Sequence, residues 1–348
     1  MSARRFAVLL VLALAVIGAA LWLTARRSLP RDVAFGEPVL PGLAAELDRV
    51  SAIRLIGAGD RTLVTLERQD SRWFVRELGY AADPARVRRL LLALGELRVT
   101  EAKTSDPAGH ALLGVAEVAD PHAQGLRLEL GGTTAPRALL LGRAAGTQGS
   151  YVRIPGEPRS LEARPALEVE RTPRGWLART VLDVAAARIQ SFEIARSDGD
   201  GWRAAKAQRE AAHYAVEGLP RGRELSHAGA SDAAAGALGN LEFDDLRRAP
   251  PRPAGERAER ATFRTFDGLE LEFEGRSAGT ERWICMHAKA DPALAARFPP
   301  AAGAPAFDAA QLRAEAARIT ALTAGWEYRL APFRYDALFR SRDELLRH

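Results

Sequence analysis

Hydrophobic side chains are concentrated in one uninterrupted run near the start of the chain. Residues 6–24 read FAVLLVLALAVIGAALWLT, and Arg5 and Arg26 flank this run closely. As a helix rising about 1.5 Å per residue, the run spans about 28 Å, close to the thickness of a bilayer's hydrocarbon core. It is too long for the core of a secretory signal and lacks a small-x-small cleavage site at its end. The pattern therefore predicts a single transmembrane anchor at 6–24 and not a cleaved signal peptide.

Arginines on both sides of this run nearly cancel as orientation signals. Arg4 and Arg5 favour a cytoplasmic N-terminus, whereas Arg26, Arg27 and Arg31 favour the reverse. A five-residue tail before a long globular body is typical of a signal anchor. We therefore expect an inner-membrane, single-pass protein with its N-terminus cytoplasmic and its body periplasmic, in contact with the lipid bilayer through residues 6–24.

Behind the anchor, alternating apolar and polar positions predict strands in the first half of the body. A helix is expected near 83–95, because Asp83-Pro84 is an N-cap followed by proline and Val87, Leu90, Leu91 and Leu94 share one face. The strands are expected near 50–57, 62–68, 72–77, 97–102, 126–130, 137–142 and 150–154.

The second half shows the same kind of pattern. Strands are expected near 188–196, 201–206, 241–247, 261–266, 269–275 and 281–288, and helices near 231–240, 308–323 and 336–347. The fold class predicted is α+β, with two duplicated modules built on antiparallel sheets behind the N-terminal helix.

Five phrases occur in both halves in the same order, which indicates duplication. They are Arg49–Leu55 with Arg188–Ile194, Asp70–Trp73 with Asp200–Trp202, Ala93–Val99 with Ala237–Phe243, Gly142–Thr147 with Gly275–Thr280, and Gly175–Leu177 with Gly325–Glu327. Two units are too few for a solenoid. The expected organisation is a tail at 1–5, the anchor at 6–24, a linker at 25–43, a first α+β module at 44–178, and a second at 179–348 that includes a C-terminal helix.

Composition argues against a nucleic-acid surface. The net charge is +5, but only Lys103, Lys206 and Lys289 are lysines, and the many arginines are interleaved with acids. No basic run alternates with aromatic residues, so nucleic acid is not an expected partner. The single cysteine, Cys285, permits no internal disulfide.

Three short motifs suggest chemistry, and each has a plainer structural explanation. Cys285-Met286-His287 offers two soft ligands on one strand face, too few for a structural zinc site. Asp198-Gly199-Asp200-Gly201 begins like a calcium loop but lacks the later ligands, so a hairpin turn is expected. Gly142–Thr147 is flanked by glycine but lacks the lysine of a phosphate-binding loop, so it is expected to join two strands. No metal or cofactor is predicted.

The remaining polar and aromatic residues define no catalytic constellation. The six histidines have no metal-binding spacing, and acid pairs such as Asp244-Asp245 are expected on the surface. A hydrolase whose acids meet only in the fold, with Asp183, Asp244 or Asp267, stays open as a third hypothesis. Four tryptophans could line a groove, although their repetition favours packing within each module: Trp73, Trp176, Trp202 and Trp326.

The predicted C-terminal helix is amphipathic and has two possible roles. It can pack back on the second module or present its apolar face to another protein. The candidate partner-facing residues are Tyr335, Leu338, Phe339, Leu345 and Leu346.

Four stretches resemble a bacterial domain-of-unknown-function family, number 4340. They are the anchor, Leu40-Pro41-Gly42-Leu43 with Ile53 onward, the phrase from Asp83 to Val99, and Gly325–Leu330. The resemblance implies a single-anchor envelope protein associated with an uncharacterised ABC-type, gliding-related exporter. It implies no catalytic residues.

The function expected is therefore that of a membrane-anchored, non-enzymatic accessory or interaction protein of the cell envelope, part of an ABC-type export complex. The alternative is a periplasmic binding module that takes a lipid or glycan in a groove between the two modules.

Overall fold

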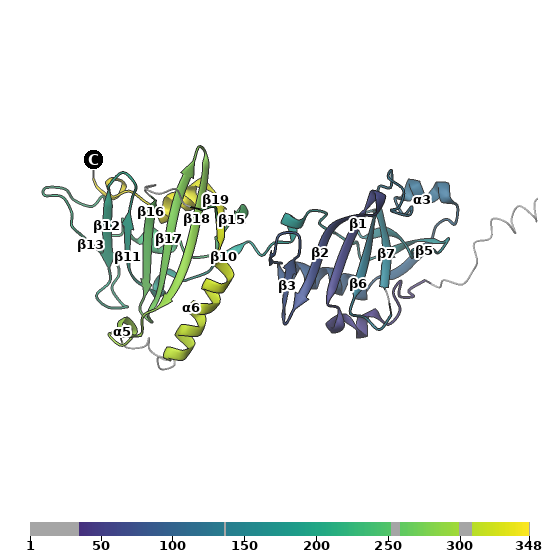
Figure 1. The fold of residues 1–348 in the computed structure, drawn as a ribbon, viewed down its shortest axis with the longest axis horizontal. Coiled ribbons are helices and arrows are strands. Elements are labelled where there is room, and N and C mark those ends of the chain that lie inside the picture. The colour runs from purple at the N-terminus through teal and green to yellow at the C-terminus, as the bar shows by residue number, and fades with distance from the viewer. Residues whose placement is uncertain (1–34, 136, 252–257, 299–307, 348) are drawn as a thin grey trace, which may run out of the picture. The chain divides into compact units, whose positions relative to one another are not determined.

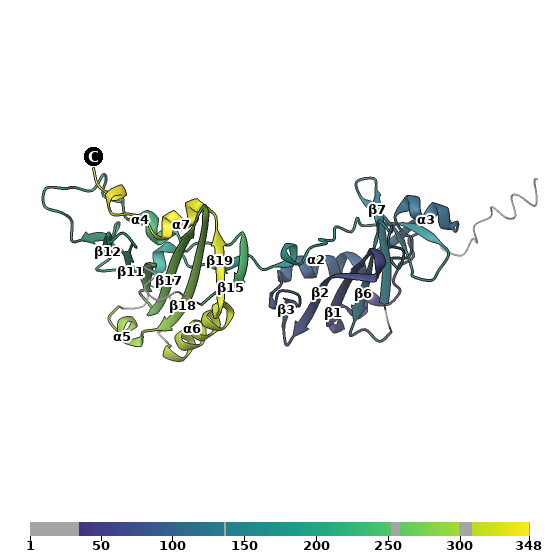
Figure 2. The ribbon, with the colours of Figure 1, turned by 45° about the horizontal axis from the view of Figure 1, so that its top comes forward.

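The computed structural model describes residues 35–135, 137–251, 258–298 and 308–347. The chain forms two compact units, Met1–Ala178 and Arg179–His348. Figures 1 and 2 show a twisted antiparallel sheet with helices in each unit. The α+β class with antiparallel sheets, predicted from the sequence, is confirmed.

The first unit is built on a nine-stranded sheet in the order β4-β3-β2-β1-β6-β7-β8-β9-β5. Its strands are β1 (Ala52–Gly57), β2 (Arg61–Gln69), β3 (Arg72–Val75), β4 (Tyr80–Ala81), β5 (Arg98–Ala102), β6 (Leu126–Gly131), β7 (Arg137–Ala145), β8 (Gly149–Arg153) and β9 (Ser160–Arg164). Its α-helices are α2 (Pro84–Gly95) and α3 (Pro107–Leu113), and its 3₁₀ helices are Leu43–Ala45, Leu47–Arg49, Ala58–Asp60 and Pro173–Trp176.

Alternation along the central strands separates the two faces of this sheet. In β6, Leu126, Leu128 and Leu130 are buried, while Arg127 and Glu129 lie on the opposite face. The helix α2 packs beside this sheet (Figure 2), and its Leu90 and apolar neighbours are buried. Burial of such leucines contributes about 1.5–3 kcal/mol for each side chain.

Both edges of the first sheet are covered by chain from outside it. On the β5 side, the main-chain N–H of Val39 donates to the carbonyl of Leu97 at 2.9 Å. On the β4 side, the N–H of Ala178 donates to the carbonyl of Ala81 at 3.0 Å. These bonds cover part of each strand edge that would otherwise be free to pair with another chain.

The second unit contains an eight-stranded sheet in the order β13-β12-β11-β16-β17-β18-β19-β15 and a two-stranded sheet, β10-β14. Its strands are β10 (Thr180–Leu182), β11 (Ile189–Ala195), β12 (Gly201–Ala205), β13 (Ala215–Glu217), β14 (Leu241–Glu242), β15 (Asp245–Arg248), β16 (Glu259–Thr265), β17 (Leu269–Ala278), β18 (Glu281–Ala290) and β19 (Trp326–Leu330). Its helices are α4 (Asp232–Gly236), α5 (Pro292–Ala295), α6 (Ala309–Thr323) and α7 (Pro332–Leu338), with 3₁₀ helices at Ala186–Arg188 and Asp343–Leu345.

One face of the second sheet holds an aromatic core. Phe192 packs edge-on against Trp202 and tilted against Phe263, with ring centroids 5.3 and 5.7 Å apart. The helix α6 lies along β18, where the Thr320 hydroxyl donates to the carbonyl of Ala288 at 2.9 Å (Figure 1).

The other face of this sheet carries ion pairs between neighbouring strands. Arg264 pairs with Glu270 at 2.7 Å and Lys289 with Glu272 at 2.6 Å. Arg264 lies directly across from Glu270, whereas Lys289 reaches Glu272 diagonally, and such cross-strand pairs contribute a few tenths to about 1 kcal/mol each.

The two large sheets share an order of strands. Apart from β4, each strand of β3-β2-β1-β6-β7-β8-β9-β5 has a counterpart in β13-β12-β11-β16-β17-β18-β19-β15. The segments that precede the last strands correspond as well. In the first unit Val39 bonds to Leu97 just before β5, and in the second unit β10 pairs with β14 just before β15.

The predicted C-terminal helix at 336–347 is wrong in its bounds. Pro332 occupies the first turn of α7, and the helix ends at Leu338. The chain then runs back across the unit, and the N–H of Arg347 donates to the carbonyl of Glu224 at 2.9 Å. Bonds to a distant loop therefore replace the helical bonds that amphipathicity alone predicts.

The predicted anchor at 6–24 lies outside the described residues. Within the described ranges, which begin at residue 35, no helix is both long enough and apolar enough to cross a membrane.

Candidate functional site

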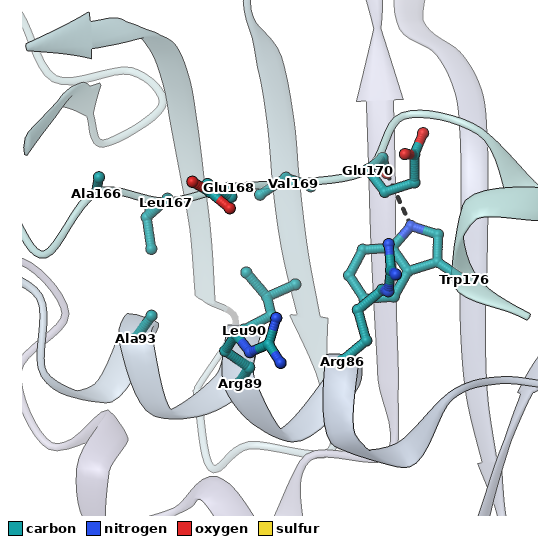
Figure 3. A pocket seen from close by; sticks show the side chains of 10 residues that line it. All are labelled: Arg86, Arg89, Leu90, Ala93, Ala166, Leu167, Glu168, Val169, Glu170 and Trp176. Carbon is teal, nitrogen blue, oxygen red and sulfur yellow. Dashed lines mark hydrogen bonds between the residues drawn. The ribbon is translucent and has the colours of Figure 1, made fainter. Parts of the chain in front are cut away.

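The first unit has a cleft of about 540 Å³ beside α2. The opposite wall is the stretch of chain that follows β9. Ligand pockets typically enclose roughly 300–1,000 Å³, so the cleft is large enough to hold a ligand. Figure 3 shows the residues that line it: Arg86, Arg89, Leu90, Ala93, Ala166, Leu167, Glu168, Val169, Glu170 and Trp176.

The helix wall is fixed by the cap at the start of α2. The Asp83 carboxylate accepts hydrogen bonds from the main-chain N–H groups of Ala85 and Arg86, at 2.9 and 3.2 Å. Such a cap stabilises a helix by about 1 kcal/mol. Arg86 and Arg89 follow three residues apart, so both lie along the same side of the helix.

The arginines of this wall have few partners. The Oδ2 atom of Asp83 lies 4.0 Å from the Nε atom of Arg86, at the limit of an ion pair. Among the residues that the structure describes, Arg89 has neither an ion pair nor a hydrogen bond. Both side chains are exposed, so their charge is available to a ligand in the cleft.

The opposite wall is an extended segment held at its two ends. The N–H of Leu167 donates to the Ser150 hydroxyl at 3.0 Å, and the indole N–H of Trp176 donates to the carbonyl of Glu170 at 2.8 Å. Glu168 and Val169 lie between these anchors and Ala166 lies just before them, and the main-chain groups of all three have no hydrogen-bond partner within the described parts of the chain. Glu168 is exposed and Ala166 and Val169 are partly buried, so these main-chain groups are open to solvent or to a ligand.

Glu170 is kept ionised by its neighbours. The Thr172 hydroxyl and the Thr172 N–H donate to its carboxylate at 2.8 and 3.0 Å. These bonds hold the pKa of the Glu170 carboxyl below its ordinary value, and the charge of Arg86 acts in the same direction.

The cleft combines an apolar floor with a charged rim. Its floor is apolar, with Leu90, Leu167 and Trp176 buried at 4, 8 and 1% exposure. Its rim carries charge of both signs. The described residues contain no group of three or more His, Cys, Asp or Glu side chains placed to hold a metal ion.

The three short motifs of the sequence lie in ordinary strands and turns. Cys285 and His287 lie within β18. Asp198–Gly201 makes the turn between β11 and β12, with Gly199 at φ 94°. Gly142–Thr147 runs from β7 into the turn before β8.

The three aspartates of the hydrolase hypothesis make separate contacts. Asp183 accepts a hydrogen bond from the N–H of Asn240 at 2.9 Å. Asp267 forms an ion pair with Arg188 at 2.8 Å. Asp244 donates its N–H to the carbonyl of Arg329 at 2.8 Å.

The five candidate partner-facing residues require a correction. Tyr335, Leu338, Phe339, Leu345 and Leu346 are buried in the second unit, at 3, 0, 0, 0 and 3% exposure. The Tyr335 and Phe339 rings pack 4.7 Å apart. Their apolar surface is already covered by their own unit, so they offer no surface to a partner, and the alternative of packing back on the module is the one observed.

Of the four tryptophans, Trp176 alone lines this cleft. Trp202 and Trp326 are buried in the second unit, and Trp73 is half-buried on β3. The packing interpretation therefore fits three of them, and Trp176 combines packing with a place in the cleft wall.

Sequence reasoning missed the cleft. The spacing of Arg86 and Arg89 is visible in the sequence, as is the extended pattern of Ala166–Glu170. Their approach is a tertiary contact between distant parts of the chain, and no local pattern encodes it.

Comparison with known proteins identifies the family. A family model described as "Domain of unknown function (DUF4340)" matches residues 46–260, so the chain belongs to this family. The match begins in the first unit and ends at the start of β16 in the second. Comparison with curated proteins gave no match, and comparison with solved structures gave none either.

Proposed function

We propose that the chain is a membrane-anchored, non-enzymatic interaction protein of the cell envelope, with the α2 cleft as a binding site for a partner protein. The observation that carries the proposal is that open arginine side chains on α2 face a stretch of chain in which the main-chain groups of Ala166, Glu168 and Val169 are unpaired within the described residues. A cleft of this kind supplies complementary charge and hydrogen bonds to a partner.

Tethering of the chain at the inner membrane belongs to the same proposal. It is supported by the apolar run at 6–24, with the N-terminus in the cytoplasm and the body in the periplasm. A C-terminal alkaline phosphatase fusion would be active in this orientation. An inactive fusion, with an active cytoplasmic reporter at the same position, would reverse the topology.

Membership of an ABC-type export complex is the finer part of the proposal. Its support is the family resemblance, which implies a gliding-related exporter as the setting. We expect tagged, full-length protein in detergent to copurify with a permease or auxiliary subunit, identified by mass spectrometry. The double variant Arg86→Glu/Arg89→Glu is expected to lose that subunit. Arg88→Glu, on the same helix but outside the cleft lining, is expected to keep it.

Recovery of the protein alone from all three preparations would contradict this proposal. A lipid or glycan ligand is the competing function, and the basic side of α2 also suits an anionic headgroup. Mass spectrometry of small molecules released from the same preparations separates the two.

We also infer that the two units arose by duplication. The shared strand order supports it, and so do three of the five repeated phrases, which fall at corresponding elements. The two phrases centred on tryptophan do not correspond, because Trp73 lies in β3 and Trp202 in β12, while Trp176 lies in a 3₁₀ helix and Trp326 in β19. An experimental structure in which corresponding strands fail to superpose would contradict the duplication.

A further inference from the structure

The extended wall of the α2 cleft has main-chain groups that lack partners. Ala166, Glu168 and Val169 lie in this wall, and none of them has a main-chain hydrogen bond to another described residue. The two edges of the neighbouring sheet are already covered at Val39 and Ala178. The unpaired stretch is therefore a place in this unit where an added strand would find partners.

A polypeptide main chain is the ligand that matches such a stretch. An extended peptide pairs its own N–H and C=O groups with those of an exposed extended segment, and its alternate side chains enter the pockets on either side. A lipid or glycan brings no regular array of donors and acceptors at strand spacing. The main-chain pattern thus favours a polypeptide over the other ligand classes.

The positive charge on the helix wall favours a peptide with acidic side chains. Arg86 and Arg89 line the cleft, whereas Arg88 on the same helix is not one of its lining residues. On the facing wall, the charge of Glu170 is already bonded by Thr172. Arginine binds carboxylates in bidentate geometry, so acidic side chains that face α2 have matching partners.

The geometry points to the α2 cleft as a docking site for an extended, acidic segment of another protein, which adds as a strand to Ala166–Val169 and places carboxylates on Arg86 and Arg89. Apolar side chains of the same segment pack on the floor made by Leu90, Leu167 and Trp176. This inference rests on the proposed function, since it specifies the partner's segment at the same cleft.

A displayed library of random nonapeptides tests the inference. Full-length protein in nanodiscs serves as bait, and the Arg86→Glu/Arg89→Glu variant serves for counter-selection. We expect the recovered peptides to alternate apolar residues with Asp or Glu. A synthetic copy should bind at least tenfold more weakly to the double variant and equally well to Arg88→Glu. A copy N-methylated at alternate main-chain nitrogens should bind more weakly to the wild-type protein.

Several results would overturn the inference. They are recovery of no peptide, recovery of peptides without acids, and binding that N-methylation leaves unchanged. Binding of anionic phosphatidylglycerol vesicles that depends on Arg86 and Arg89, without peptide binding, would assign the cleft to a lipid. If peptide selection fails while a subunit still copurifies with wild type and not with the double variant, the proposed function stands without this ligand class.

Discussion

Trp176 donates its indole N–H to the main-chain carbonyl of Glu170 at 2.8 Å, and this bond fixes one end of the cleft wall. Trp176 is 1% exposed, so the bond is made inside the unit. We expect Trp176→Phe to lower the free energy of unfolding by about 1–2 kcal/mol, through the lost hydrogen bond and the smaller ring. Amide exchange across 166–170 should quicken in the variant, as read by mass spectrometry.

Trp73→Phe is the matched control for this variant. Trp73 is half-buried on β3, and its indole N–H has no hydrogen-bond partner among the described residues. Its exchange pattern at 166–170 should match that of the wild type. Equal exchange in all three proteins would contradict the role given to Trp176.

The ionisation of Glu170 gives the cleft a predictable response to acid. Its folded pKa lies below the ordinary value of 4.5, because Thr172 and Arg86 favour the charged carboxylate. A lowered folded pKa stabilises the folded unit above the unfolded pKa, and this stabilisation disappears as the pH falls through the folded pKa. We expect Thr172→Val to raise the pKa of Glu170, measured by NMR titration of side-chain carboxyl carbons.

Glu46 serves as the internal reference in that titration. The pKa of its carboxyl is also lowered, chiefly by a hydrogen bond from the N–H of Thr134, far from the substitution in sequence. The pKa of Glu46 should stay where it is in Thr172→Val. An unchanged Glu170 pKa in the variant would mean that Thr172 does not hold the carboxylate.

Strands with strict alternation and a recognisable helix start were predictable from the sequence. Asp83-Pro84 located α2 within a residue, and the leucines of β6 located that strand. Strand β19 was not predicted. Its start at Gly325-Trp326 resembles Gly175-Trp176 in sequence, but Trp176 lies in a 3₁₀ helix and Trp326 begins a strand. Strand β9 was also missed, although it is as long as β5 and β8, which were predicted.

Long-range contacts explain what the sequence could not show. The last residues of the chain are amphipathic, yet main-chain bonds such as that from Ser226 N–H to the carbonyl of Leu345 hold them outside a helix. The cleft depends likewise on contact between α2 and a segment that follows β9. Such partners are chosen by the packing of the whole unit, and local propensity does not report them.

Gly142 permits close main-chain packing inside the first unit. A Cβ at this position would run into the carbonyl oxygen of Leu113 and the main chain of Gly114. We expect Gly142→Ala to lower the free energy of unfolding by about 1–3 kcal/mol, because main chain must move to make room. Chemical denaturation of the full-length protein measures it.

Gly236→Ala is the opposite case and serves as the control. Gly236 lies in α4, and nothing lies within 4 Å of the position of its added Cβ. This substitution should be neutral or should raise stability by about 0.4–1 kcal/mol. Equal destabilisation by the two variants would show that the close contact at Gly142 is not the cause.

The side chain of Glu327 is buried in the second unit. It is 2% exposed, and Arg247 and Arg276 reach its two oxygens at 2.7 and 2.8 Å. We expect Glu327→Ala to lower the free energy of unfolding by about 2–3 kcal/mol, because two arginines then face each other without their carboxylate. Glu217→Ala breaks the exposed pair with Arg203 and should cost less than about 1 kcal/mol. A similar loss of unfolding free energy in the two variants would show that the buried ion pairs of Glu327 stabilise the fold no more than an exposed pair does.

Photo-crosslinking from inside the α2 cleft tests directly whether a partner protein binds there. The full-length protein, with Val169 replaced by p-benzoylphenylalanine, would be irradiated in membranes of its host, and adducts would be identified by mass spectrometry. We expect one discrete adduct with an envelope protein, which disappears when Arg86→Glu/Arg89→Glu is added and is absent when the probe replaces Arg203 in the second unit. No protein adduct from position 169, or the same adducts from both positions, would contradict the claim that this cleft binds a partner.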